Sequence, residues 1–213
     1  MNNIFSFLNT IQIPDFWLLV LTFLLSVSIV YLIEYLKRPS VKIDLFPDLI
    51  LPDGKRKFLK IKIKVYKSGW LREIFPWQNP ASFARLKCYL IESLGGKELE
   101  VFSYTAKWDT RPEPWDYEKN IPRIELLPAT SEPENFVVGD EGTTAVAAKH
   151  KGEDNFYIYD GNYYVNQIGN KRDEKKIKLR VIFSSSSVTT RKDFAIVNGN
   201  STLEAFSLKE ILK

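Results

Sequence analysis

Residues 58–66 read FLKIKIKVY, and this stretch indicates the fold class of most of the chain. Apolar residues alternate with lysines, so an extended chain places the apolar side chains on one side and the lysines on the other. Such a period of two is typical of a strand with one buried face. The pattern returns in ARLKCYL at residues 84–90 and in KIKLRVIF at residues 176–183. The sequence therefore predicts an antiparallel β-sheet protein.

Turn residues separate these strand patterns and predict how they connect. Pro52-Asp53-Gly54 stands between strand-like residues 41–51 and the FLKIKIKVY stretch, which favours a hairpin. Asp160-Gly161 lies between two runs rich in tyrosine and favours a second hairpin. We therefore expect residues 37–200 to form an all-β domain, an antiparallel β-sandwich with one polar face on each sheet.

The C-terminal tail shows a different pattern. Ser201 and Glu204 have the spacing of a capping box, in which each side chain bonds a backbone N–H at the start of a helix. Several apolar residues follow at spacings that suit one helix face: Leu203, Phe206, Ile211 and Leu212. The tail, residues 201–213, is therefore predicted to be helical.

Residues 16–36 read FWLLVLTFLLSVSIVYLIEYL and predict a transmembrane helix. At ~1.5 Å per residue, such a helix spans roughly 30 Å, the thickness of a hydrocarbon core. Its one charged residue, Glu34, lies a turn from the end, and Pro39 ends the helix. The preceding tail, residues 1–15, contains no Lys or Arg, whereas a cleaved signal peptide has a basic start. The segment is therefore interpreted as a membrane anchor.

Charge on the two sides of this segment predicts its orientation. Lys37, Arg38 and Lys42 follow it, and none of the residues before it is basic. Basic residues favour the cytoplasmic side, so we expect the N-terminus outside and the β domain in the cytoplasm of a single-pass membrane protein. The triplet Asn200-Ser201-Thr202 is a glycosylation motif and argues for the opposite side.

The succession KIKVYKSG…NPASFARLKCYL, followed much later by KIKLRVIFSSS…FAIVN, carries a resemblance. It resembles uncharacterised single-pass membrane proteins that have an immunoglobulin-like β-sandwich. The resemblance spans most of residues 41–198 and implies a fold, without a catalytic residue or a ligand. The Cys…Trp…Cys spacing of true immunoglobulin domains is absent.

The residue inventory leaves few kinds of chemistry. Cys88 is the one cysteine and His150 the one histidine, too few for a zinc site of the usual composition. Neither common glycine-rich phosphate loop is present. A net charge of +4 without a basic cluster does not indicate nucleic acid. We therefore expect no catalytic residue, no metal and no cofactor, and we interpret Cys88 as a small core residue.

Residues 107–120, KWDTRPEPWDYEKN, combine acidic and aromatic side chains in a proline-rich segment. Three interpretations are open: the acids pair with nearby basic residues, the segment binds a partner, or two carboxylates hydrolyse a glycan. Possible partner-binding residues are Trp108, Asp109, Trp115, Asp116 and Tyr117.

Residues 68–80, SGWLREIFPWQNP, combine tryptophans with an arginine. Short segments of this kind settle at membrane interfaces, where the polar edge of each ring stays hydrated. Possible membrane-interface residues are Trp70, Arg72, Phe75 and Trp77. The alternative is a loop that folds over the end of the sandwich and buries its own tryptophans.

These patterns favour a non-catalytic interaction module anchored in the cell membrane, as a subunit or scaffold of a membrane complex. Its expected partners are the lipid bilayer and another protein. An extracytoplasmic domain that binds a glycan or another ligand is the alternative, and it requires the opposite membrane orientation. A membrane-bound hydrolase that uses the acidic segment is a third possibility.

Overall fold

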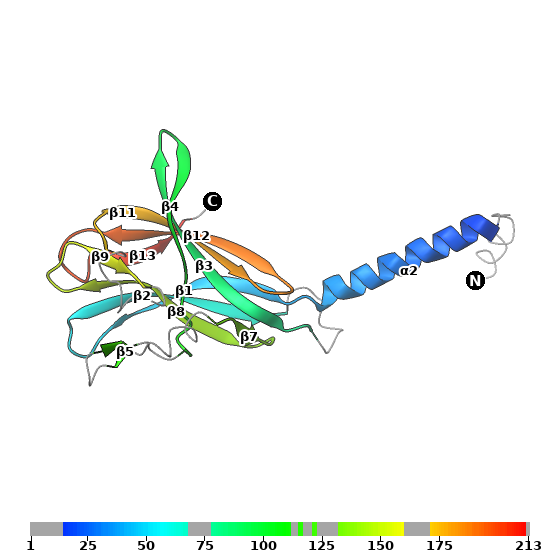
Figure 1. Cartoon of the computed structure of the whole chain (residues 1–213), viewed down its shortest axis with the longest axis horizontal. Coiled ribbons are helices and arrows are strands. Elements are labelled where there is room, and N and C mark those ends of the chain that lie inside the picture. Colours follow the sequence, from blue (N-terminus) through cyan, green and yellow to red (C-terminus); the bar gives the residue numbers. More distant parts are fainter. Residues whose placement is uncertain are drawn as a thin grey trace, which may run out of the picture.

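The computed structural model describes residues 15–67, 78–111, 115–116, 121–122, 132–159 and 171–211. Within these ranges it contains one helix, α2 (Asp15–Lys37), and a β domain built mostly of antiparallel strands. Figure 1 shows α2 extending away from this domain. The predicted helix and the predicted β-rich character are both confirmed.

Two large sheets make up the β domain (Figure 1). The first sheet has the order β1 (Ser40–Ile50), β2 (Arg56–Tyr66), β8 (Glu141–His150), β9 (Phe156–Ile158) and β10 (Lys171–Arg172). The second has the order β13 (Phe206–Glu210), β12 (Thr189–Asn198), β11 (Lys176–Ser184), β3 (Ala81–Leu94) and β4 (Lys97–Thr105), and β7 (Glu134–Phe136) pairs with the start of β3. A separate pair consists of β5 (Trp115–Asp116) and β6 (Ile121–Pro122).

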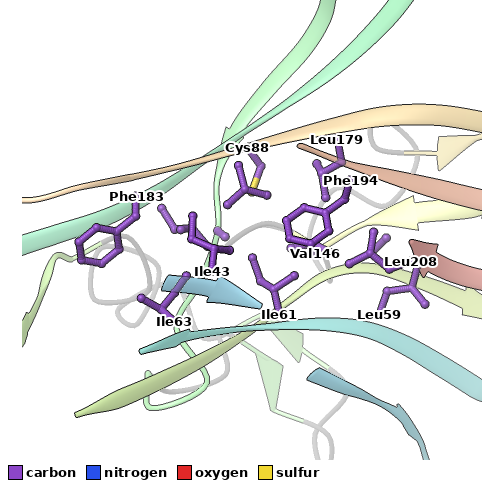
Figure 2. Close-up of a cluster of buried hydrophobic side chains, with 14 of the residues drawn as sticks. Ile43, Leu59, Ile61, Ile63, Cys88, Val146, Leu179, Phe183, Phe194 and Leu208 are labelled. Atoms are coloured by element: carbon purple, nitrogen blue, oxygen red, sulfur yellow. The ribbon is translucent and has the colours of Figure 1, made fainter. Parts of the chain in front are cut away.

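Side chains from both sheets meet in one hydrophobic core (Figure 2). The alternating residues predicted to face inward do so, and each is at most 2% exposed: Leu59, Ile61, Ile63 and Val65 from β2, Ala84, Leu86, Cys88 and Leu90 from β3, and Ile177, Leu179, Val181 and Phe183 from β11. Complete burial of a Leu, Ile or Phe side chain contributes about 1.5–3 kcal/mol. The period of two in the sequence therefore marks the faces that hold the sheets together.

The first predicted hairpin is confirmed. β1 and β2 pair antiparallel from Ser40↔Tyr66 to Ile50↔Lys57. In the turn, Gly54 adopts φ +63° and donates its N–H to the Leu51 carbonyl at 2.8 Å. The second predicted turn, Asp160-Gly161, lies outside the described residues. The strands on its two sides, β9 and β10, pair antiparallel. Residues 160–170 connect Tyr159 to the start of β10.

The prediction of a helical C-terminal tail is wrong. Phe206–Glu210 forms β13, which pairs antiparallel with β12 through Ile196↔Leu208. Phe206 and Leu208 are buried, and Ser207 between them is not. The tail thus has the alternation of a strand, and burial against the open edge of β12 outweighs the local helix signal.

The junction between helix and β domain is short and hydrogen-bonded. α2 ends at Lys37, whose carbonyl accepts the Asn79 N–H at 3.0 Å. The Asn79 side-chain amide donates to the Glu34 carboxylate at 3.4 Å. Leu36 is buried at this junction, with 8% of its surface exposed. The last turn of the helix is therefore fixed to the segment that leads into β3.

Candidate functional site

The hairpin formed by β3 and β4 extends beyond the body of the β domain (Figure 1). We call its outer part, residues 91–101, the hairpin arm. Gly95 and Gly96 make its turn with φ +58° and +82°, the positive values that tight two-residue hairpins require. Residues 93–101 are all exposed. In the described part of the chain β4 pairs with β3 alone, so its other edge is open.

The two faces of the hairpin arm differ in chemistry. Residues paired across strands point to the same side, so the pairs Ile91↔Glu100 and Ser93↔Glu98 belong to one face, directed away from the core. The pairs Glu92↔Leu99 and Leu94↔Lys97 belong to the other. The acidic residues Glu98 and Glu100 thus share the outer face of the second sheet with β11 and β12.

A hollow of about 420 Å³ lies on this outer face, between the arm and the neighbouring strands. It is lined by Tyr89, Ile91, Glu98, Glu100, Arg180, Ile182 and Arg191. Ligand sites commonly have volumes of ~300–1,000 Å³ and combine apolar surface with a few polar groups. Here the carboxylates come from β4 and the guanidinium groups from β11 and β12, so opposite charges face each other across an apolar floor.

Asp193 of β12 is the centre of an ion-pair network beside the hollow. Its carboxylate, 7% exposed, lies 2.8 Å from Lys178 Nζ, 3.1 Å from Arg180 Nε and 3.1 Å from Arg191 Nη2. Burial raises the pKa of the Asp193 carboxyl, but the hydrogen bonds from these three side chains outweigh burial and hold that pKa well below its usual range. Asp193 is therefore ionised at neutral pH.

The same network holds the hairpin arm in place. Glu98 of the arm accepts hydrogen bonds from Lys178 and Arg180, each at 2.6 Å, and these bonds lower the pKa of Glu98. Lys178 and Arg180 therefore connect the arm to Asp193 within the sheet. The arm projects from the body, yet Glu98, close to its turn, is bound by charged side chains from β11.

Two of the predicted partner-binding residues have structural contacts. Trp108 is 3% exposed and packs edge-on against Phe136, with ring centroids 5.0 Å apart. The Asp109 carboxylate lies 2.5 Å from Lys60 Nζ and accepts a hydrogen bond from Thr143 at 2.6 Å. For Trp108 and Asp109, burial and ion pairing therefore agree with the structural interpretation of this segment.

The other predicted site residues are placed in part or not at all. Trp115 and Asp116 form β5, and the structure describes their backbone pairing with β6 but not their side chains. Tyr117 lies outside the described residues, as do all four predicted membrane-interface residues: Trp70, Arg72, Phe75 and Trp77.

The two rarest reactive residues lie apart from the hollow. Cys88 is completely buried, and burial raises the pKa of its thiol to about 12, so the interpretation as a core residue is confirmed. Burial has the opposite effect on His150 and lowers the pKa of its imidazole. The His150 ring packs against that of Tyr157, with the ring centroids 5.4 Å apart. Across the described ranges, no three His, Cys, Asp or Glu side chains are grouped to hold a metal ion.

The site residues predicted from the sequence include none from the hairpin arm, although a signal was present. Gly95-Gly96 between two strand-like runs is a typical two-residue hairpin turn. The ion pairs that fix the arm join residues far apart in the chain, and no local pattern reveals them. A comparison with protein-family models, curated proteins and solved structures finds no match to this chain.

Proposed function

We propose that this protein is a non-catalytic interaction module anchored in a membrane by α2. The observation that carries the proposal is the exposure of the helix. Its apolar side chains project on every side: Trp17, Leu19, Phe23 and Tyr31, for example, are 59%, 70%, 67% and 73% exposed. The most apolar 18-residue window within Trp17–Lys37 has a mean hydropathy of 2.2, and none of this window is buried. A helix that is apolar all round needs an apolar environment, and a bilayer provides it.

Hydrogen bonding inside the helix supports burial in lipid. The hydroxyl groups of Thr22, Ser26 and Ser28 each donate to the carbonyl four residues earlier, at 2.8 Å. These three hydroxyl groups therefore do not require water. The bonds from Asn79 to the helix end support a retained anchor rather than a cleaved leader, because cleavage would remove their acceptors.

The fold and orientation that we propose extend this argument. Two antiparallel sheets around one core support an immunoglobulin-like β-sandwich. Lys37 and Arg38 follow the helix and residues 1–15 contain no Lys or Arg, which supports a cytoplasmic β domain and an N-terminus outside.

The face that we assign to a protein partner is the hairpin arm with its hollow. The open edge of β4 offers backbone N–H and C=O groups to an extended segment, a common mode of peptide recognition. The hollow beside it offers the Glu100 carboxylate on one side and, on the other, Arg191, which is partly exposed beside Asp193. A segment that carries both charges fits this arrangement better than a polyanion does.

The first test concerns the anchor. In cells that express the chain with a C-terminal tag, the protein should stay in membranes after carbonate washing. The double substitution Leu24→Arg/Leu25→Arg should release it, since each arginine near the centre of a membrane helix costs about 2.5–3.5 kcal/mol. Protease added to intact cells should leave the tag untouched and should remove it after lysis.

Each result can contradict a different part of the proposal. Release of the unsubstituted protein by carbonate would refute the anchor. Cleavage in intact cells, or a glycan on Asn200, would refute the cytoplasmic orientation and favour the extracytoplasmic alternative.

The second test concerns the partner face. A photoreactive benzoylphenylalanine at Glu100, on the exposed arm, should form a crosslinked adduct in native membranes. The matched control is the same residue at Glu204, an exposed acidic position in the connection between β12 and β13. Adducts of equal yield at both positions, or an adduct at Glu204 alone, would show that the arm is not the specific contact.

A further inference from the structure

Phe83 adopts a backbone conformation that its residue type rarely accepts. Its φ is +55°, and among the described residues it is the one non-glycine residue with a positive φ. It lies at an irregularity where Ala81 pairs with Phe136 and Ala84 with Glu134, which leaves an extra residue in β3. The Phe83 N–H donates to the side-chain carbonyl of Asn135 at 2.9 Å. This bond holds the strained backbone in place.

The Phe83 side chain does not gain burial in return. It is 70% exposed, more than any other described phenylalanine of the β domain. A phenylalanine that is both strained and exposed has no stabilising role in the fold, and strained backbone tends to occur at functional positions. The bulge directs a large apolar ring out of the β domain.

Val137, the residue directly after β7, presents a second exposed apolar side chain. It is 56% exposed at the start of a tight turn. Its N–H donates to the Asp140 carboxylate at 2.7 Å, and the Asp140 N–H donates back to its carbonyl at 3.0 Å. The turn is fixed to β2, because Gly139 donates to the Val65 carbonyl at 2.9 Å.

Phe83 and Val137 both belong to the end of the β domain where α2 is attached. Val65 is next to the Ser40↔Tyr66 pair that begins β1, three residues after the helix ends. Phe83 follows four residues after Asn79, which is bonded to Lys37, and ~3.3 Å per residue places it within roughly 13 Å of that bond. In Figure 1, β7 and the start of β3 lie on the helix side of the domain.

Charges at this end suit a lipid surface. Two nearby carboxylates are ion-paired: Glu134 with Arg111 at 3.4 Å, and Glu141 with Lys62 and Lys64 at 3.1 and 3.2 Å. The Asp140 carboxylate is instead bound by the Val137 N–H of its own turn. Arg38 and Arg85 are exposed and form no ion pair within the described residues. Arg38 and Arg85 are therefore available to an external partner, and the headgroups of the cytoplasmic leaflet are negative.

We propose that Phe83 and Val137 insert into the interface of the bilayer that α2 spans, with Arg38 and Arg85 against lipid phosphates. This inference rests on the proposed membrane anchor and adds a second, peripheral contact. Together with the helix, the two side chains give the β domain one fixed face toward the membrane.

The test uses the full-length protein in liposomes of neutral and anionic phospholipid. An environment-sensitive fluorophore is attached to a cysteine introduced by Phe83→Cys or Val137→Cys. Two further variants serve as references: Leu25→Cys in the middle of α2, and Leu94→Cys at the tip of the hairpin arm, an exposed apolar position on the same strand as Phe83. The buried Cys88 should remain unlabelled, so one label per chain confirms that each variant is folded.

We expect blue-shifted emission at residues 83 and 137 and its loss when lipids carry a quencher near the headgroup. The fluorophore at residue 25 should be quenched by a quencher placed deep in the acyl chains. The fluorophore at residue 94 should be quenched by neither the shallow nor the deep quencher. Emission at both 83 and 137 that matches residue 94, while residue 25 is quenched, would overturn this inference and leave the anchor standing. Absence of quenching at residue 25 would overturn the anchor itself. If Phe83→Cys labels at Cys88 as well, Val137→Cys alone decides the result.

Discussion

The substitution Phe206→Ala should lower the free energy of unfolding by about 3–5 kcal/mol, because it empties a fully enclosed site. Phe206 has no exposed surface, and its ring lies 5.6 Å from that of Phe156 in the first sheet. It is also the first residue of β13, so its loss weakens both the contact between sheets and the edge strand. Urea denaturation in mild detergent, followed by circular dichroism, measures the effect.

Phe83→Ala is the matched control. The same atoms are removed from a side chain that is 70% exposed, so stability should change by less than about 0.5 kcal/mol. Equal losses for the two variants would contradict the core position of Phe206. A loss of unfolding free energy below about 1 kcal/mol for Phe206→Ala would indicate that the tail is peripheral, and would favour the helical tail predicted from the sequence.

The second large effect is expected from Asp193→Asn, at about 2–3 kcal/mol near neutral pH. The amide leaves Lys178, Arg180 and Arg191 around a neutral group, and breaking a buried ion pair typically costs about 3–5 kcal/mol. The three cations here are partly exposed, which reduces the penalty. Glu100→Gln is the control, since Glu100 lines the same hollow and forms no ion pair with the described residues.

The effect of Asp193 depends on pH in a defined direction. The pKa of Asp193 is lower in the folded protein than in the unfolded chain. Its stabilising contribution is therefore complete above the unfolded value of about 3.9, and it is lost as the pH falls toward the folded value. Lowering the pH from about 5 to about 2 should reduce the free energy of unfolding more for the wild-type protein than for Asp193→Asn. Parallel curves for the two proteins would show that Asp193 does not carry this dependence.

How much of the fold can be predicted depends on where the signal lies. The alternation at residues 58–66 is local and one face is buried, so it predicts the strand and its inward residues correctly. At residues 201–213 a local helix signal competes with the open edge of β12, and the edge belongs to a distant part of the chain. Local patterns cannot weigh such a contact, so that prediction failed.

The candidate site shows the same limit. Trp108 and Asp109 were predicted to bind a partner because aromatic and acidic residues are often used in binding. In the structure Trp108 is buried and Asp109 forms an ion pair with Lys60. The hairpin arm has exposed residues on both faces and therefore no alternation to recognise. Its position depends on Glu98 meeting Lys178 and Arg180 from a strand that is distant in sequence, which only the folded structure reveals.

The junction between α2 and the β domain is short, so the helix and the domain should move together. Only Arg38 and Pro39 separate the helix from β1, and Asn79 clamps the helix end from the side. Membrane helices change their tilt when the thickness of the bilayer changes. Because the described part of this junction is short and hydrogen-bonded, a tilt of α2 in the proposed membrane would move the β domain and its hairpin arm as well. The position of the arm above the membrane would then report the thickness of the lipid around it.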